Sequence, residues 1–149
     1  MRRQIPAIWS PGGMAVAVLF VTLAVVPSRV FAQNEPEHVL QEVERAFGQG
    51  DSRVLSDASA DRVEITLFGS TTLFSRGQAA FVLNDFFQQY PPRRCDFKEA
   101  TRTDGSWFAA GQYWYGTTDT PLQVYVGLRE RGAAWELREI RIEEQVQRN

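Results

Sequence analysis

Residues 74–92 read FSRGQAAFVLNDFFQQYPP, and they decide the fold because they define a helix with a clear start and end. Ser75 and Gln78 have the spacing of a capping box, in which each side chain bonds to the backbone amide of the other residue. The double proline at 91–92 cannot continue a helix, so we expect the helix to end near Tyr90. Its apolar residues recur at helical spacing and predict one buried stripe: Ala79, Val82, Leu83, Phe86, Phe87 and Tyr90.

Two more helices and a short hairpin are predicted before this helix. Residues 37–47 carry apolar side chains on one helical face, and the glycines within 48–50 supply a stop. A shorter helix is expected over 52–58. Apolar and polar residues alternate over 63–67, which predicts a half-buried strand, and after a turn 72–74 form a short return strand.

After the double proline the sequence is rich in strand-forming residues. We expect strands over 94–103, 106–117, 122–130 and 134–144, separated by glycine- or proline-containing turns. Strands of about ten residues suit long antiparallel hairpins. The chain therefore divides into a helical first part and a strand-rich second part.

The last predicted strand changes parity along its length. Trp135 and Leu137 share one face of a regular strand, whereas Ile140 and Ile142 share the opposite face. One extra residue near Arg138 and Glu139 would bring all four apolar side chains to the same face. We therefore predict a β-bulge at this point and a curved sheet.

The strand around residues 107–115 is apolar on both faces. A strand with one wet face alternates cleanly between apolar and polar residues, so both faces of this strand should be covered. We expect helices to cover one face and a second copy of the chain to cover the outer face, which predicts a homodimer. One face carries Trp107, Ala109, Tyr113 and Tyr115, and the other carries Phe108, Ala110 and Trp114.

The order of these elements, together with several short motifs, resembles a known superfamily. The motifs are Gly50-Asp51, Val63-Glu64-Ile65, Phe74-Ser75-Arg76-Gly77-Gln78-Ala79, Asn84-Asp85-Phe86-Phe87 with Pro91-Pro92, and Ile140-Arg141-Ile142-Glu143. The chain resembles the nuclear transport factor two-like superfamily, whose cone fold ketosteroid isomerase also adopts. It is most similar there to an exported bacterial domain-of-unknown-function family, number 4783.

The resemblance implies an α+β, cone-shaped fold with three helices of the N-terminal half packed on a curved, mainly antiparallel sheet. We expect a single domain over residues 37–144, followed by a polar tail at 145–149. The family has no assigned reaction, so the resemblance transfers no catalytic residue, and a shared fold does not define a function.

The N-terminus has the three parts of a secretory signal peptide. Arg2 and Arg3 are followed by an apolar run over 14–26, which is short for a bilayer span of about 20 residues. The sequence Val30-Phe31-Ala32 predicts cleavage after Ala32, leaving residues 33–36 as a short leader. We expect an exported protein, periplasmic or extracellular, with no stable membrane anchor after cleavage. The alternative is an uncleaved N-terminal anchor.

Charge and composition restrict the possible partners and cofactors. Residues 1–32 contain three arginines and no acid, so the remaining 117 residues carry 13 basic and 18 acidic side chains, a net charge of −5. An acidic surface disfavours nucleic acid as a partner. One histidine and one cysteine provide no zinc site, and we expect neither a metal nor another cofactor.

Cys95 is expected to pack as a small apolar residue. The alternative is a reactive thiol, because Arg93 and Arg94 could supply the positive charge that such a thiol needs.

No residue is assigned a catalytic role from the sequence. Asp85 lies on the outward side of its predicted helix, and capping or turn formation explains Asp57 and Asp61. His38 lies about 140° from the centre of the apolar stripe of its helix and is expected to face solvent. Phe81 interrupts a polar helix face, either as an ordinary exposed aromatic or as a contact point for a terminus or a partner.

The leading hypothesis is a non-catalytic domain that binds a small apolar ligand or another protein. One alternative is a lyase, isomerase or hydrolase that uses a pocket carboxylate and a tyrosine. Another is a structural partner in an envelope assembly, without an open pocket. An enzyme needs an acid inside the pocket beside a hydrogen-bond donor, and a ligand-binding domain needs an open apolar cavity. The residues proposed to line a pocket are Trp107, Tyr113, Tyr125, Phe86, Phe87 and Tyr90.

Overall fold

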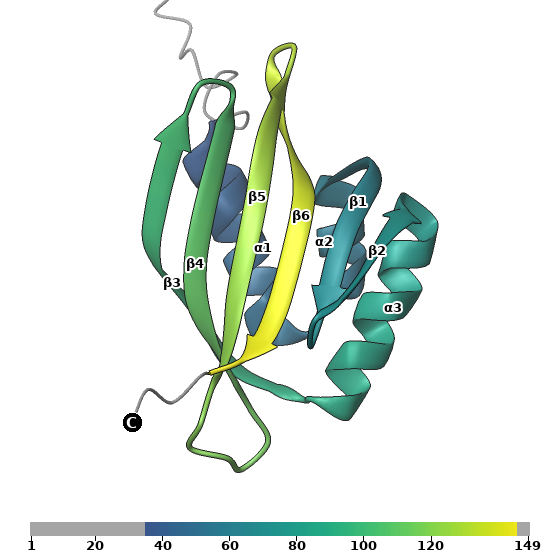
Figure 1. The fold of residues 1–149 in the computed structure, drawn as a ribbon, viewed down its shortest axis with the longest axis vertical. Coiled ribbons are helices and arrows are strands. Elements are labelled where there is room, and N and C mark those ends of the chain that lie inside the picture. The colour runs from purple at the N-terminus through teal and green to yellow at the C-terminus, as the bar shows by residue number, and fades with distance from the viewer. Residues whose placement is uncertain (1–34, 146–149) are drawn as a thin grey trace, which may run out of the picture.

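The computed structural model describes residues 35–145, in which three helices cover one face of a six-stranded sheet (Figure 1). The expected α+β fold is confirmed. The predicted signal peptide and residues 146–149 lie outside the described residues. The elements are α1 (Pro36–Gln49), α2 (Ser52–Ala58), β1 (Ser59–Leu67), β2 (Ser70–Ser75), α3 (Arg76–Gln89), β3 (Pro92–Thr103), β4 (Ser106–Tyr115), β5 (Leu122–Arg131) and β6 (Ala134–Glu144).

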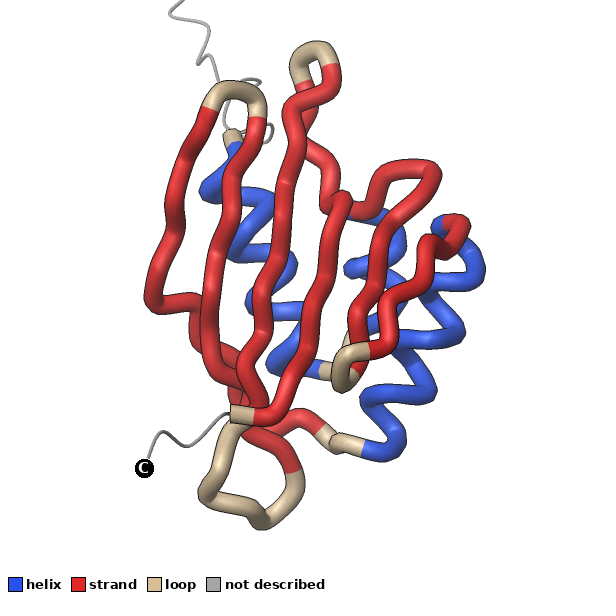
Figure 2. Tube along the Cα trace, in the orientation of Figure 1, coloured by secondary structure: helices blue, strands red, loops and turns tan. Residues whose placement is uncertain are grey.

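The sheet has the strand order β2-β1-β6-β5-β4-β3, and the strands follow one another across the molecule in Figure 2. All neighbouring strands are antiparallel except β1 and β6, which are parallel. This parallel pair joins the first strand of the chain to the last. It therefore links the helical first part of the chain to the strand-rich second part.

The predicted bulge is present in β6. Gly127 of β5 pairs with Glu139, whereas the next residue, Leu128, pairs with Leu137, so Arg138 is the extra residue. As a result Leu137 and Ile140 are both buried on the helix-covered face, and the apolar side chains keep one face through the strand.

The helix ends follow the local signals in the sequence. The capping box of α3 is formed, with Ser75 N–H donating to Gln78 Oε1 at 3.0 Å and Gln78 N–H donating to Ser75 Oγ at 3.4 Å. Asp51 caps α2 by accepting from two backbone amides. Gly50 ends α1 in the left-handed region, at φ 70°, which glycine adopts without strain.

β1 begins earlier than expected. The predicted strand starts at residue 63, but the structure extends it back to Ser59, which pairs with Leu137 of β6. Residues 59–62 read SADR and have weak strand propensity, so pairing of Ser59 with β6 and of Arg62 with β2, rather than local preference, makes them a strand.

The core lies between the helices and the helix-covered face of the sheet. The largest fully buried side chains are Tyr113, Phe47, Leu55, Ile65, Leu83, Leu128, Leu137, Ile140, Ile142, Val43, Val63 and Val124. They come from all three helices and from β1, β4, β5 and β6. One continuous core therefore holds the domain together.

Candidate functional site

Aromatic rings occupy the space between α1, α3 and the sheet. Tyr113 of β4 is fully buried, and its ring centroid lies 5.4 Å from that of Phe86 and 6.3 Å from those of Phe47 and Phe87. Tyr90 stacks on Phe86 at 5.1 Å. These five rings fill the space between the two helices and the sheet.

The Tyr113 hydroxyl is occupied by the protein itself, because it donates a hydrogen bond to the backbone carbonyl of Tyr90. Burial, with a contribution from nearby Cys95, raises the pKa of Tyr113 far above its ordinary value. The hydroxyl therefore stays protonated at neutral pH and serves as a structural donor at the end of α3.

Cys95 packs beside this cluster as a buried thiol. Burial raises the pKa of Cys95 to about 12, and the carboxylates of Glu44 and Asp96 add to the rise. The neighbouring arginines are used elsewhere, since Arg94 pairs with Asp96 at 3.2 Å and Arg93 donates to the carbonyl of Thr118. A thiol with a raised pKa is a poor nucleophile, so the structure favours the packing role.

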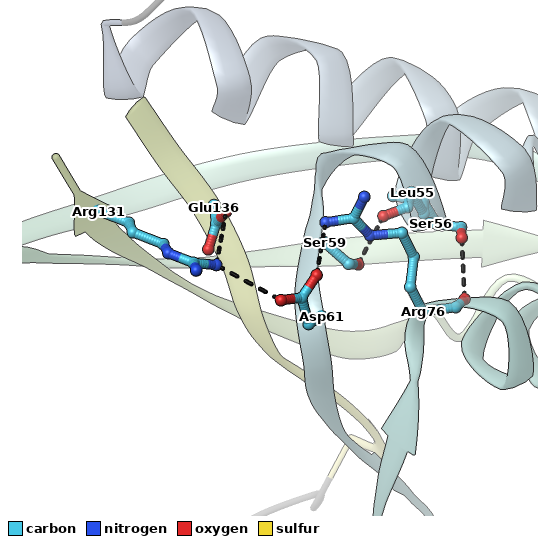
Figure 3. Close-up of polar contacts among 7 residues, drawn as sticks. All are labelled: Leu55, Ser56, Ser59, Asp61, Arg76, Arg131 and Glu136. Atoms are coloured by element: carbon cyan, nitrogen blue, oxygen red, sulfur yellow. Dashed lines mark hydrogen bonds and ion pairs between the residues drawn. The ribbon is translucent and has the colours of Figure 1, made fainter. Parts of the chain in front are cut away.

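The buried polar side chains among residues 35–145 are neutral hydroxyls. Ser56 Oγ donates to the carbonyl of Arg76 at 2.9 Å, and Ser59 Oγ donates to the carbonyl of Leu55 at 2.7 Å (Figure 3). Thr66 bonds to Thr71 at 2.8 Å. Each hydroxyl therefore has a partner within the fold.

The acids considered from the sequence lie at the surface. Asp61 sits between two arginines, 3.5 Å from Arg76 and 3.6 Å from Arg131, and Arg131 also pairs with Glu136 (Figure 3). Asp57 is exposed, and exposed Asp85 accepts from Gln89 at 2.8 Å. Among residues 35–145 the fully buried tyrosine, Tyr113, bonds to a backbone carbonyl and not to an acid, whereas Tyr125 shares a surface hollow with Glu99 and Glu139.

The remaining titratable groups form no metal centre in residues 35–145. His38 lies at the surface of α1, with Nδ1 4.0 Å from Glu42 Oε1. No set of three or more His, Cys, Asp or Glu side chains in this range is placed to hold a metal ion. No described helix is long and apolar enough to cross a membrane.

The helices leave the outer face of the sheet open (Figure 1). This face carries large apolar side chains at its centre. β4 and β5 pair so that Phe108 is opposite Gly127 and Ala110 is opposite Tyr125. The Phe108 ring lies over Gly127, where a Cβ atom would come within 3.3 Å of the ring. Phe108 is 47% exposed and Tyr125 is 40% exposed, which is high for aromatic residues in the middle of a sheet.

Two connected hollows surround these aromatic residues. One, of about 290 Å³, lies at Phe108 and Tyr125; the other, of about 620 Å³, shares Phe108 and Glu139 with the first and extends to β1 and β2. Charged residues of both signs line them. The charged lining residues are Asp61, Arg62, Glu64, Glu99, Arg129, Arg131, Arg138, Glu139 and Arg141. We call Phe108, Tyr125 and the residues that line the two hollows the outer-face site.

The structure brings four of the six predicted pocket residues together. Phe86, Phe87, Tyr90 and Tyr113 form the interior cluster. Trp107 lies on the same face of the sheet but contacts Trp135, at 6.5 Å between ring centroids, rather than this cluster.

Tyr125, also predicted to line a pocket, lies on the opposite face of the sheet from the interior cluster. Tyr125 alternates with buried Val124 and Val126, so its side chain points to the outer face, away from the interior cluster. Parity along β5 contains this information. Val124 and Val126, at the alternating positions, are the side chains of β5 that face the core.

Sequence reasoning did not select Phe108, Glu139 or Arg141 as site residues. Phe108 could have been predicted from strand alternation, because it lies between Trp107 and Ala109 and must therefore point to the opposite face. Glu139 and Arg141 belong to the site only because β6 lies beside β5, and no local signal in the sequence predicts that neighbour.

A curved, mostly antiparallel sheet with three helices on one face defines the class of this protein as an α+β domain. An NTF2-like protein of unknown function from Shewanella baltica OS155 has a similar structure, with a TM-score of 0.58 at 11% identity. That comparison covers 74% of this chain and 91% of the other. At this identity the likeness shows the fold alone.

The chain belongs to the family described as Domain of unknown function (DUF4783), whose model matches residues 40–143. A family protein from Bacteroides uniformis ATCC 8492 has a TM-score of 0.66 at 20% identity, covering 72% of this chain and 97% of that one. Another from Bacteroides ovatus ATCC 8483 has a TM-score of 0.65 at 24% identity, covering 71% and 94%. No curated protein matches the chain.

Proposed function

We propose that this protein is an exported, non-catalytic interaction domain that forms a homodimer through the outer-face site. The observation that carries the proposal is the pair of exposed rings, Phe108 and Tyr125, at the centre of the sheet face that the helices leave open. Burying such an apolar patch against a partner is favourable because it removes apolar surface from water.

The charges of the outer-face site suit a second copy of the same chain. In a two-fold symmetric interface the same patch meets itself, so it must contain both signs of charge. Arg141 pairs with Glu139 at 3.2 Å, and Arg62, Arg129 and Arg138 lie on the same face as Glu64 and Glu99. With this mixture, acidic side chains of one copy can pair with basic side chains of the other across the two-fold axis.

The filled interior supports protein interaction over storage of a small apolar ligand. Tyr113, Phe47 and Phe86 occupy the space behind the sheet, so an internal ligand would have to displace packed rings. The outer-face site is open and needs no such rearrangement. It therefore provides surface that a partner protein can cover directly.

We expect light scattering of residues 33–149 to give the mass of two chains at micromolar concentration. Phe108→Arg should weaken the dimer by about 30-fold or more, because it places a charge at the centre of the interface. Val54→Arg, at an exposed position of α2, is the matched control and should leave the mass unchanged. A wild-type protein with the mass of one chain at all concentrations would contradict the dimer.

Export is tested by the mass of the protein recovered from a bacterial host. We expect the soluble product outside the cytoplasm to lack residues 1–32, because small residues at 30 and 32 suit signal peptidase. Ala32→Arg should block cleavage and keep the full-length chain with the membrane. Intact wild-type chain retained at the membrane would instead support the uncleaved anchor.

A further inference from the structure

The outer-face site is built from two rows of residues that run across the strands. β3, β4, β5 and β6 lie side by side, and their register fixes which residues share a row (Figure 2). The first row contains Thr101, Phe108, Gly127 and Glu139, and the second contains Glu99, Ala110, Tyr125 and Arg141. Every side chain of the two rows lines the smaller hollow, so the rows share one face of the sheet.

Large and small residues change strands from one row to the next. In the first row the large residue is on β4, with Phe108 opposite Gly127, and in the second it is on β5, with Tyr125 opposite Ala110. Consider a second copy related by half a turn about an axis that runs along the strands, between β4 and β5. Tyr125 of each copy then lies over Ala110 of the other. The Phe108 rings, which lean over Gly127 toward the axis, meet there, so the two faces interlock.

The same rotation places β3 of one copy over β6 of the other. Glu99 of one copy then faces Arg141 of the other. Glu99 is exposed and forms no ion pair within residues 35–145. Arg141 binds Glu139 through one guanidinium nitrogen, at 3.2 Å, and has further donors for a second carboxylate. β3 and β6 each lie about 7 Å from the axis and packed sheets lie about 10 Å apart, a separation that Glu and Arg side chains can bridge.

A second pair of opposite charges meets in the next row. Lys98 is the extra residue where the register of β3 shifts, and its Nζ donates to Gln112 Oε1 at 3.0 Å. Gln112 pairs with Gln123, which pairs with Glu143 of β6, so Lys98 and Glu143 lie at the two ends of this row. Glu143 also forms no ion pair within the described range. The rotation therefore places a lysine opposite this acid.

An axis that runs across the strands, halfway between the first two rows, suits the charges less well. It also places large residues over small ones. However, it brings Glu139 opposite Arg141, and these two already pair within each chain. It leaves Glu99 opposite Thr101, without a base. An acid that is covered but unpaired is costly, so the charges favour the axis along the strands.

We infer that two copies of the chain pack outer face to outer face about an axis parallel to β4 and β5, with Glu99 of each copy bound to Arg141 of the other. This inference rests on the proposed dimer and adds the contact that makes it specific. A chain with like charges at these two positions is rejected, because both contacts of the dimer then become repulsive.

The test uses two single variants of residues 33–149. Glu99→Arg and Arg141→Glu should each form homodimers about 10-fold more weakly than wild type, because like charges face each other twice. When the two variants are mixed, both contacts of the heterodimer join opposite charges. The heterodimer should therefore bind about 10-fold more tightly than either homodimer, as measured by native mass spectrometry of the mixture. Both positions are exposed, and circular dichroism checks that the variants fold.

Glu37→Arg, at an exposed position of α1 on the opposite side of the sheet, is the matched control. Mixed with Arg141→Glu, it should give heterodimers only in the statistical proportion. A wild-type dimer whose Glu99→Arg and Arg141→Glu variants also mix statistically would overturn this orientation and leave the dimer in place. A wild-type chain that stays monomeric at all concentrations would overturn both the dimer and the inference.

Discussion

Tyr113→Ala is expected to lower the free energy of unfolding by about 4 kcal/mol, the scale seen when a large buried aromatic residue is cut to alanine. A domain of this size has about 5–15 kcal/mol in total, so much of its stability would be lost. The reason is geometric: Tyr113 is fully buried and contacts rings from α1 and α3, so its removal leaves a cavity where helices and sheet meet.

The hydroxyl of Tyr113 contributes separately from its ring. Tyr113→Phe keeps the ring but leaves the partly buried carbonyl of Tyr90 without its donor, and should cost about 1 kcal/mol. Urea unfolding followed by circular dichroism measures both variants. Tyr125→Phe is the matched control: its ring lies on the outer face, so we expect a change within about 0.5 kcal/mol. An equal effect at the two tyrosines would contradict the structural role of the Tyr113 hydroxyl.

Gly111→Ala is expected to be as damaging as removal of the Tyr113 ring, although it adds a single methyl group. A Cβ atom at Gly111 would lie 2.2 Å from the carbonyl oxygen of Asp96 and 2.8 Å from Phe97 Cα. These are backbone atoms of β3 beside the register shift between Phe97 and Glu99, and they cannot rotate away. We expect a loss of about 3 kcal/mol or more, at the upper end for overpacking.

Gly77→Ala makes the same chemical change where the structure has room. A Cβ atom there meets nothing within 4 Å, and the residue lies in the first turn of α3. Alanine favours the helical backbone, so this variant should be about 0.5 kcal/mol more stable than wild type. Urea unfolding of both variants at one protein concentration checks the pair, and a stable Gly111→Ala protein would show that β3 does not lie so close to β4.

Local signals in the sequence predict most of the helices and strands. The capping box at Ser75 and the double proline mark the ends of α3, and apolar spacing identifies α1. Even the bulge at Arg138 follows from parity, because Leu137 and Ile140 must reach the same core. These features depend on interactions between residues that are close together in the chain. Such interactions do not require distant segments to be in contact.

The candidate sites depend on contacts that no local pattern contains. The outer-face site needs β6 to lie between β5 and β1, with β1 and β6 parallel. Tyr125 was predicted to line a pocket together with the interior aromatic residues, but the burial of Val124 and Val126 places its ring on the outer face. Either face of a short apolar strand can be buried, and packing against the neighbouring elements decides which one is.

By itself the sequence determined the order and type of the helices and strands, where the last strand bulges and which family the chain resembles. The tertiary structure alone decided that aromatic rings fill the interior and that the open surface is the outer face. The physical reason is that strand order and packing are set by the total burial of apolar surface between segments far apart in the chain. This free energy is gained only when the whole domain assembles, so it cannot be assigned to a single segment of the sequence.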